Sequence, residues 1–287
     1  MFNFIKNIIS KISNSYVPTN NYKYHNHKRI YVYPEISDDN IRNRELVKNI
    51  LYSNIEFSCS KILHDYFIYN TGVGIDKYLR YFDLYDRYFS KYRGKDINLL
   101  EVGVQNGGST KMWKYYFTYN LPNVNVNIYG VDIDARCKDI EEEGIKIFIG
   151  SQTDREFWRK LKNEIPKIDI LIDDGGHKMD QQIITLEEMY DHIKDNGLYW
   201  CEDTSTSYWK SHGGGYKNNN TYIEYTKNII DYLNAYYALK DDDLTTNIYT
   251  DTAYSICYHE NVVVIEKRIR NKIFNTYPMA FIGNSIR

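Results

Sequence analysis

A short stretch near the middle of the chain combines residues that can do chemistry with the pattern of a buried strand. Residues 168–177 read IDILIDDGGH, in which an apolar run ends in Asp173, Asp174, two glycines and His177. Short apolar runs of this kind are typical of strands in a parallel sheet that is covered on both faces. Because open α/β sheets bind ligands at the carboxyl ends of their strands, we expect these polar side chains to lie in a site.

A second stretch repeats the pattern further along the chain. Residues 197–203 (GLYWCED) begin as an apolar run and end at Glu202 and Asp203. Two neighbouring strands that end in carboxylates form either a cation site or a costly cluster of like charges. Hard oxygen ligands at an open site suit Mg²⁺, and Mn²⁺ or Ca²⁺ are also compatible. We therefore predict that Asp174, Glu202 and Asp203 bind a divalent cation; the alternative is that these acids only cap helices and bind water.

His177 is the candidate general base, since it lies three residues beyond Asp174. A neutral imidazole can take a proton from a substrate hydroxyl. The alternative is a histidine at a helix start that is bonded to a carboxylate. Asp173 points to the opposite face from Asp174 if strand geometry persists, so it is a weaker cation ligand and we count it with the cofactor-binding candidates.

A glycine-rich turn follows the strand-like run that begins at Ile97. Residues 101–109 read EVGVQNGGS, and glycines such as Gly103 and Gly107 let the backbone approach a ligand closely. The spacing differs from the dinucleotide fingerprint GxGxxG, and a P-loop is excluded because no GK[ST] follows. Asp132 ends the next strand, where an acidic residue can accept hydrogen bonds from ribose hydroxyls. We predict nucleoside binding at this turn; the alternative is a turn that serves only for tight packing.

Two polar residues follow the third strand of the series, IKIFIG (145–150). Gln152 and Asp154 are candidates to read an adenine edge. Asp154 is equally suited to be the N-cap of the next helix, and we favour capping as its only role.

From Ile97 onward strands and helices alternate, which predicts a doubly wound α/β sheet with helices on both faces. The tail changes character: residues 252–259 and 262–268 are strand-like runs around Glu260 and Asn261, which is a hairpin signal. Parallel βα units closed by an antiparallel C-terminal hairpin are the layout of a Rossmann-like class I methyltransferase. An ordinary dinucleotide-binding fold would continue with parallel strands.

The first part of the chain has a different pattern, and we divide the chain into residues 1–95 and 96–287. Residues 1–16 carry apolar side chains near one helical face, which favours packing against this protein or a partner subunit over membrane contact. Residues 41–69 have helical spacing, and residues 71–93 carry a stripe of aromatic side chains of the kind usually found in a core. We expect residues 1–95 to form a helical appendage with a lid or oligomer role, and 96–287 to form the catalytic domain.

Composition excludes several classes. Among 287 residues the charged groups nearly balance, with a formal net charge of −2, so no basic excess indicates nucleic acid. The four cysteines form no CxxC pair, which argues against a disulfide framework or zinc knuckle and favours a reducing compartment. No apolar run approaches the length of a transmembrane helix, and the first residues lack a small-residue cleavage site, so we do not expect a secretory signal.

Taken together, the motifs resemble the class I S-adenosylmethionine-dependent methyltransferases that act on sugar hydroxyls. The resemblance is carried by residues 101–108, 130–134 (GVDID), 173–177 (DDGGH), 202–203 and 206–209 (TSYW), and it spans about Thr71 to Arg268. It is greatest to the magnesium-dependent macrolide-sugar O-methyltransferases of the mycinamicin type and the related cephalosporin-biosynthesis proteins. Gly176 stands where this family usually has Ser.

The resemblance implies a role for each motif. It implies that Asp174, Glu202 and Asp203 are metal ligands and that His177 is the general base. The cofactor contacts that it implies are Glu101, Gly103, Ser109 and Asp132. A macrolide substrate does not follow, because the regions that would face the acceptor diverge.

We therefore expect a metal-dependent, cytoplasmic O-methyltransferase that moves a methyl group from S-adenosylmethionine to a hydroxyl of a sugar or glycosylated small molecule. The loop of residues 205–220, rich in Gly, Ser and Asn, is expected to close over the acceptor. We expect a homo-oligomer, and no nucleic acid partner. Two alternatives stay open: an NAD-linked or other nucleotide-dependent enzyme of Rossmann-like fold, and a catalytically silent scaffold that binds S-adenosylmethionine.

Overall fold

The computed structural model describes residues 24–25, 28–29, 60–70, 72–78, 80–239 and 243–269. The chain divides into two compact units, residues 1–55 and 56–287. The helix expected over residues 1–16 and the helical stretch expected over 41–59 lie outside the described residues, as does Cys59. In the first unit, the described residues form a two-stranded antiparallel ladder of β1 (Tyr24–His25) and β2 (Lys28–Arg29).

The second unit contains a seven-stranded sheet in the order β5-β4-β3-β6-β7-β9-β8. Its strands are β3 (Ile97–Val102), β4 (Val126–Asp132), β5 (Ile145–Ile149), β6 (Ile168–Asp173), β7 (Ile193–Cys201), β8 (Ala253–His259) and β9 (Val262–Lys267). β3 to β7 pair in parallel, whereas β9 pairs antiparallel with both β7 and β8. The predicted fold class is therefore confirmed, including the C-terminal hairpin around Glu260 and Asn261.

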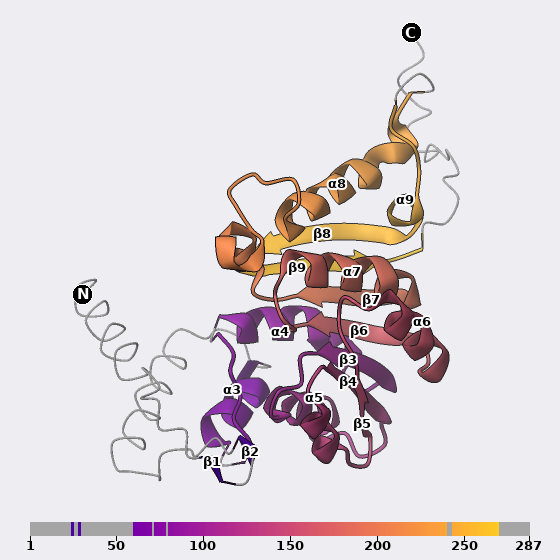
Figure 1. Cartoon of the computed structure of the whole chain (residues 1–287). Coiled ribbons are helices and arrows are strands. Elements are labelled where there is room, and N and C mark those ends of the chain that lie inside the picture. Colours follow the sequence, from indigo (N-terminus) through magenta and orange to yellow (C-terminus); the bar gives the residue numbers. More distant parts are fainter. Residues whose placement is uncertain are drawn as a thin grey trace, which may run out of the picture. The chain divides into compact units, whose positions relative to one another are not determined.

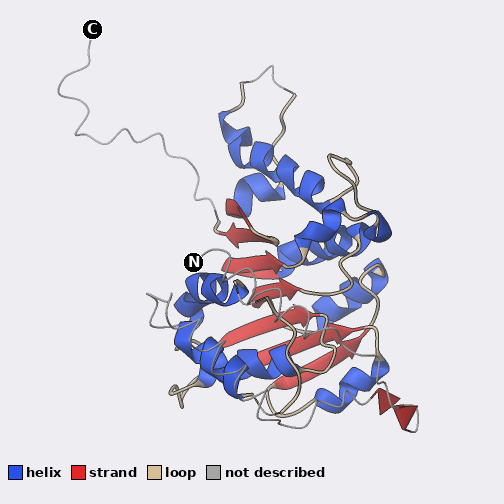
Figure 2. Ribbon diagram, turned by 90° about the vertical axis from the view of Figure 1, so that its left-hand side faces the viewer, coloured by secondary structure: helices blue, strands red, loops and turns tan. Residues whose placement is uncertain are grey.

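Helices cover both faces of this sheet, as Figures 1 and 2 show. The α-helices are α3 (Ser60–Tyr69), α4 (Tyr81–Phe89), α5 (Gly108–Thr118), α6 (Arg155–Glu164), α7 (Met179–Met189), α8 (Tyr222–Asn234) and α9 (Ile248–Thr252). The short 3₁₀ helices are η1 (Ser90–Tyr92), η2 (Ala135–Ile140), η3 (Tyr190–His192), η4 (Thr204–Tyr208), η5 (Lys210–His212) and η6 (Ala235–Tyr237). None of the described helices is long and apolar enough to cross a membrane.

Successive strand residues alternate between two hydrophobic clusters, one on each face of the sheet. On the first face, Leu99 and Trp200 pack with side chains of α3, α4 and α5. On the second face, Leu100 and Tyr199 pack with side chains of α6, α7, α8 and α9. This is the two-residue period of a strand buried on both sides, and it is why these segments read as continuous apolar runs in the sequence.

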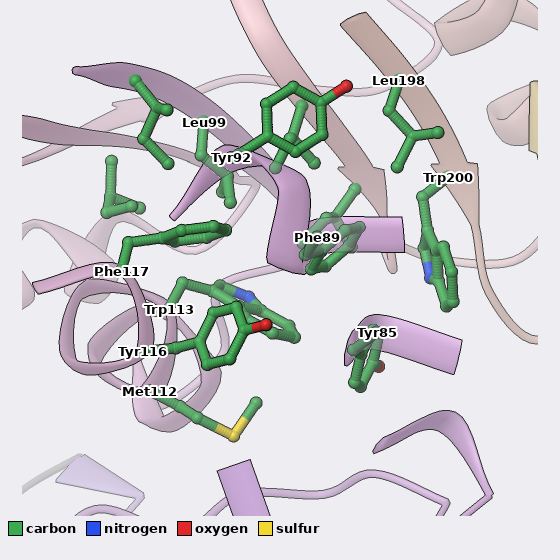
Figure 3. Close-up of a cluster of buried hydrophobic side chains, with 14 of the residues drawn as sticks. Tyr85, Phe89, Tyr92, Leu99, Met112, Trp113, Tyr116, Phe117, Leu198 and Trp200 are labelled. Atoms are coloured by element: carbon green, nitrogen blue, oxygen red, sulfur yellow. The ribbon is translucent and has the colours of Figure 1, made fainter. Parts of the chain in front are cut away.

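Aromatic side chains dominate the first cluster (Figure 3). The ring of Tyr85 lies 4.8 Å from that of Trp113 and 5.0 Å from that of Trp200. The aromatic stripe predicted around these residues thus belongs to the core from Tyr81 onward. Tyr78 is the exception, because α4 begins only at Tyr81 and the Tyr78 side chain is exposed.

Because α3 and α4 share a hydrophobic cluster with the sheet, residues 56–95 lie in the same compact unit as the strands. The division at residue 95 and the lid or oligomer role of the first part stay predictions. Helix α4 contributes to the site by placing the hydroxyl groups of Tyr81 and Tyr85 beneath the carboxyl edge of the sheet.

Candidate functional site

The carboxyl ends of β3, β6 and β7 lie level with one another. The register pairs Val102 with Asp173 and Asp173 with Cys201, and the ladder continues one residue beyond each strand. The amide of Asp174 donates to the Val102 carbonyl (2.9 Å), and that of Glu202 donates to the Asp173 carbonyl (2.9 Å). The acids that were predicted to converge therefore leave adjacent strands side by side.

Three side chains at this edge face one another. The Nε2 atom of His177 lies 3.8 Å from Oδ1 of Asp174 and 3.6 Å from Oδ2 of Asp203. One ligand atom from each of the three side chains lies within 4.8 Å of the others. His177 and Asp203 both have positive φ angles, 55° and 54°, which non-glycine residues adopt rarely. We call Asp174, His177 and Asp203 the triad.

The side chain of Asp203 is oriented by hydrogen bonds from the β8–β9 hairpin and from α4. Its Oδ1 atom accepts hydrogen bonds from the Tyr81 hydroxyl (2.7 Å) and from the Asn261 amide group (2.9 Å). Asn261 lies in the β8–β9 turn with φ of 63°, and its side-chain oxygen also accepts from the amide of Ser205 (2.7 Å). With Oδ1 occupied in this way, Oδ2 is left to face His177.

Glu202 lies below the triad and is bonded to protein groups. Its Oε1 atom accepts from the Tyr85 hydroxyl and from the Trp200 indole N–H (2.9 Å), and its Oε2 atom accepts from the Lys77 ammonium (2.9 Å). Its side chain is 1% exposed, against 29% for Asp203. Glu202 thus belongs to the same edge as the triad but does not face it.

Lys77 places a positively charged side chain among these carboxylates. Its ammonium group donates to Oδ2 of Asp174 and to Oε2 of Glu202, and its side chain is 2% exposed. Burial by itself would lower the pKa of Lys77, but the carboxylates of Asp174, Glu202 and Glu101 raise that pKa above its usual range. Lys77 is therefore positively charged.

His177 is neutral near pH 7. Burial lowers its pKa below the ordinary value, although the negative charges of Asp203 and Glu202 oppose the shift. Its Nδ1 atom is buried and has no hydrogen-bond partner among the residues that the structure describes. A neutral imidazole with Nε2 turned toward two carboxylates suits either proton uptake or metal binding.

The carboxylates of the triad suit a divalent cation. Oxygens of Asp174 and Asp203 converge from the ends of two strands with the His177 imidazole beside them, and cations such as Mg²⁺ and Mn²⁺ bind carboxylate oxygens together with water. The residues present therefore fit a divalent cation.

The glycine-rich turn lies beside the triad and needs glycine for steric reasons. Gly103 has φ of 90°, and a Cβ atom on it would lie 2.0 Å from the carbonyl oxygen of Asp174. Gly107 has φ of 79° and precedes the first residue of α5, where left-handed geometry ends the turn. Gly103 thus brings the backbone of the turn against the backbone that follows β6, whereas Gly107 lies against the side chain of Ile140.

Glu101 is buried beneath this turn rather than open to solvent. Its carboxylate accepts from the Thr110 hydroxyl and from the Trp113 indole N–H (2.9 Å). Burial raises its pKa, which the charge of Lys77 and bonds from Thr110, Ser109 and Trp113 oppose. Glu101 thus joins β3 to α5 from below, and Ser109 contributes from the first turn of that helix.

Asp132 closes the turn from β4. Its Oδ2 atom accepts from the backbone N–H groups of Val104 and Gln105, both at 2.9 Å. Its Oδ1 atom accepts from the N–H of Asp134 (2.9 Å). The carboxylate is half-buried, so lone pairs remain toward solvent beside the turn.

The other predicted cofactor residues hold the turn after β6. Gln152 donates to Oδ1 of Asp173 (2.9 Å) and accepts from the N–H of Gly176 (2.8 Å). Asp173 is fully buried, and it also accepts from the Tyr199 hydroxyl (3.3 Å). Asp154 caps α6 by accepting from the N–H groups of its first turn, which is the role that the sequence favoured.

The loop predicted to close over the acceptor contains η4 and η5 and begins beside Asp203. The amides of Gly214 and Gly215 donate to the carbonyls of Trp209 (2.9 Å) and Ser207 (2.8 Å), which folds the loop back on itself. Trp209 and Tyr216 are exposed, so the loop presents aromatic rings to solvent. Closure of the loop stays a prediction.

Sequence reasoning missed the residues that hold the acids. Lys77 belongs to no motif, Asn261 was read only as part of a hairpin turn, and Tyr81 and Tyr85 were read only as core aromatics. The rings of the two tyrosines do lie in the core, but their hydroxyl groups reach Asp203 and Glu202. The spacing of four residues between them was the available signal, because it places both hydroxyls on one side of α4.

Comparison with known proteins gives relatives but no family model, since none matches the chain. The demethylmacrocin O-methyltransferase of Streptomyces fradiae is 30% identical over 199 residues, which cover 66% of this chain and 48% of that protein. The 8-demethyl-8-alpha-L-rhamnosyl tetracenomycin-C 2'-O-methyltransferase of Streptomyces olivaceus is 29% identical over 192 residues, covering 64% of this chain and 49% of that protein. The chain thus spans about half the length of the curated relatives it matches.

A solved structure agrees with these relatives. The MycE methyltransferase of the mycinamycin biosynthetic pathway, in complex with Mg and SAH, aligns with a TM-score of 0.63 and 28% identity, covering 75% of this chain and 55% of that one. The predicted resemblance is therefore confirmed in both sequence and fold.

Proposed function

We propose that this chain, which has the class I methyltransferase fold and resembles sugar O-methyltransferases in sequence, is itself a metal-dependent O-methyltransferase. It would transfer the methyl group of S-adenosylmethionine to a hydroxyl of a sugar or glycosylated small molecule. The observation that carries the proposal is the placement of the Asp174, His177 and Asp203 triad at the carboxyl edge of the sheet, beside the Gly103–Gly107 turn. MycE, which has the same fold, is described in complex with Mg and SAH.

In this proposal the turn after β3 binds the cofactor. Gly103, Gly107 and Ser109 approach it through the backbone, and Asp132 accepts hydrogen bonds from the ribose hydroxyls. Glu101, Gln152 and Asp173 are buried, so their contribution is to hold the backbone that contacts the cofactor. Asp154 caps α6, and we assign it no contact with the cofactor.

The acids at the ends of β6 and β7 hold the divalent cation. Asp174 and Asp203 offer partly exposed oxygens, and Glu202 adds negative charge from below. Mg²⁺ is the preferred ion for hard oxygen ligands, with Mn²⁺ and Ca²⁺ as substitutes. A bound cation supplies Lewis acidity, which lowers the pKa of a coordinated acceptor hydroxyl.

His177 is the general base that takes the proton of the acceptor hydroxyl. Its lowered pKa keeps the imidazole neutral near pH 7, and it lies at the opening between the two carboxylates. The exposed rings of Trp209 and Tyr216 lie on the loop that follows Asp203, where they are suited to cover the apolar face of a sugar. The sulfonium methyl is already activated, so orientation of the acceptor supplies much of the rate.

The two alternatives lack support of this kind. The relatives are named as methyltransferases, and the turn is not a dinucleotide fingerprint, so an NAD-linked oxidoreductase is disfavoured. A silent scaffold would not need a neutral histidine and two carboxylates in left-handed or strand-end positions aimed at one point. We further propose a homo-oligomer. We also propose a location in the cytoplasm, with which the free thiols of Cys137, Cys201 and Cys257 are consistent.

The test is methyl transfer from S-adenosylmethionine to a panel of vicinal-diol sugars, with and without EDTA. Chelation should abolish transfer and Mg²⁺ should restore it, while calorimetry still detects S-adenosylhomocysteine but not NAD. His177→Ala should keep cofactor and metal yet lose about 10²–10⁴ in rate, the usual worth of a positioned base. Asp174→Ala should lose metal-dependent activity, because an anionic ligand is gone.

Each part of the proposal can fail separately. Full activity in EDTA would refute the metal requirement, and a fully active His177→Ala enzyme would refute the assignment of the base. Binding of NAD in place of S-adenosylhomocysteine would refute the reaction class.

A further inference from the structure

Lys77 occupies a place in the acid cluster that no motif assigns. It comes from the segment between α3 and α4, and its ammonium bridges Asp174 and Glu202 while its side chain is almost fully buried. Asp174 is therefore shared, since Oδ2 meets Lys77 and Oδ1 faces His177 in the triad.

The charge balance of the edge explains why a lysine lies there. Glu101, Asp174 and Glu202 all act on Lys77, and a buried group of carboxylates without a counter-ion would be costly. Lys77 neutralises part of this charge. A divalent cation would do the same, and two cations at the same carboxylates would repel each other.

The segment that carries Lys77 also touches the cofactor turn. We call residues 72–78 the strap. A Cβ atom on Gly108 would lie 2.0 Å from the carbonyl oxygen of Gly74, so the strap crosses the first residue of α5 in direct backbone contact. Withdrawal of Lys77 from the acids would thus move chain that borders the Gly103–Gly107 turn.

We propose that Lys77 is a tethered placeholder for the divalent cation. It neutralises Asp174 and Glu202 while the cation is absent and withdraws from them when the cation binds, so it sets the affinity of the site. This inference rests on the proposed function, because it takes the acid cluster to be a cation site. In this proposal Glu202 becomes available as a metal ligand only after Lys77 has withdrawn from it.

The first test compares Mn²⁺ binding to the wild-type chain and to Lys77→Met by isothermal titration calorimetry. Met keeps most of the side-chain volume and removes the competing charge, so Lys77→Met should bind Mn²⁺ at least about tenfold more tightly. Equal or weaker binding by the variant would overturn the placeholder role and leave the cation site standing. No Mn²⁺ binding by the wild-type chain would overturn the cation site and, with it, this inference.

The second test uses the wild-type chain, so it does not depend on whether the variant folds. Lysines are acetylated with sulfo-N-hydroxysuccinimide acetate, with and without saturating Mg²⁺, and the sites are quantified by mass spectrometry. Lys77 should be protected without Mg²⁺ and should react several-fold faster with it. Lys267 is the matched control, because its side chain is also buried but donates to the carbonyls of Tyr190 and Ile193 away from the acids.

The acetylation experiment would contradict the proposal if Lys77 stays as protected as Lys267 in saturating Mg²⁺ while Mn²⁺ binding is measurable. Lys77 would then be a fixed structural counter-ion and not a placeholder.

Discussion

Replacement of Asp132 by alanine should damage both the cofactor site and the fold, and the structure separates the two effects. The carboxylate accepts three backbone N–H bonds, from Val104, Gln105 and Asp134. Hydrogen bonds to a charged group contribute about 1.5–3 kcal/mol each. Because the site is half-buried and water can replace part of these bonds, we expect Asp132→Ala to lower the free energy of unfolding by about 2 kcal/mol.

The affinity of Asp132→Ala for the cofactor should fall as well, independently of the loss of stability. Removal of a charged acceptor for the ribose hydroxyls should cost about 1.5–3 kcal/mol of binding free energy, or roughly 10- to 150-fold in the dissociation constant of S-adenosylhomocysteine. Affinity is measured by calorimetry well below the melting temperature of the variant, and stability by urea unfolding. Binding can then be read from folded protein alone.

Asp154→Ala is the matched control, since this carboxylate also accepts backbone N–H groups at the same edge of the sheet. Loss of this N-cap should cost about 1 kcal/mol of stability and leave the affinity unchanged. If Asp132→Ala binds S-adenosylhomocysteine as tightly as the wild-type chain, the nucleoside lies elsewhere. If Asp154→Ala weakens binding as much, the loss of affinity comes from a general disturbance of this edge of the sheet and not from lost hydrogen bonds to the ribose.

Three further predictions follow from buried contacts. Tyr85→Phe keeps the ring in the core but removes a donor to buried Glu202, so urea unfolding should show a loss of about 1.5–3 kcal/mol; an unchanged midpoint would contradict this. Burial raises the pKa of Asp173 to about 7, so the native state holds its proton more tightly than the unfolded chain and stability should fall as pH rises from about 4 to 7. Asp173→Asn cannot titrate, and unfolding curves of the variant should lack that part of the slope shown by the wild type. Gly103→Ala places a Cβ 2.0 Å from the Asp174 carbonyl at positive φ, so the melting temperature and cofactor binding should both drop, and retention of both would refute the close approach.

The sequence by itself determined the sheet and the polar residues at its edge. Apolar runs that end in Asp174 and Glu202 predicted adjacent parallel strands, and the hairpin at Asn261 predicted the antiparallel closure. These features are readable because strand period, turn chemistry and the position of ligand sites at carboxyl ends are local or topological rules. The N-cap role of Asp154 followed in the same way from local hydrogen bonding.

Only the tertiary structure decided how the acids divide between a partly exposed triad and a buried carboxylate. Asp203 and Glu202 are neighbours in the chain, yet the positive φ of Asp203 turns its side chain toward His177 while Glu202 lies among Tyr85, Trp200 and Lys77. The contact between Lys77 and Glu202 joins residues 125 positions apart. A sequence pattern cannot encode such a contact, because whether a lysine meets a carboxylate depends on the packing of the whole core, which sets the burial that makes the pairing favourable.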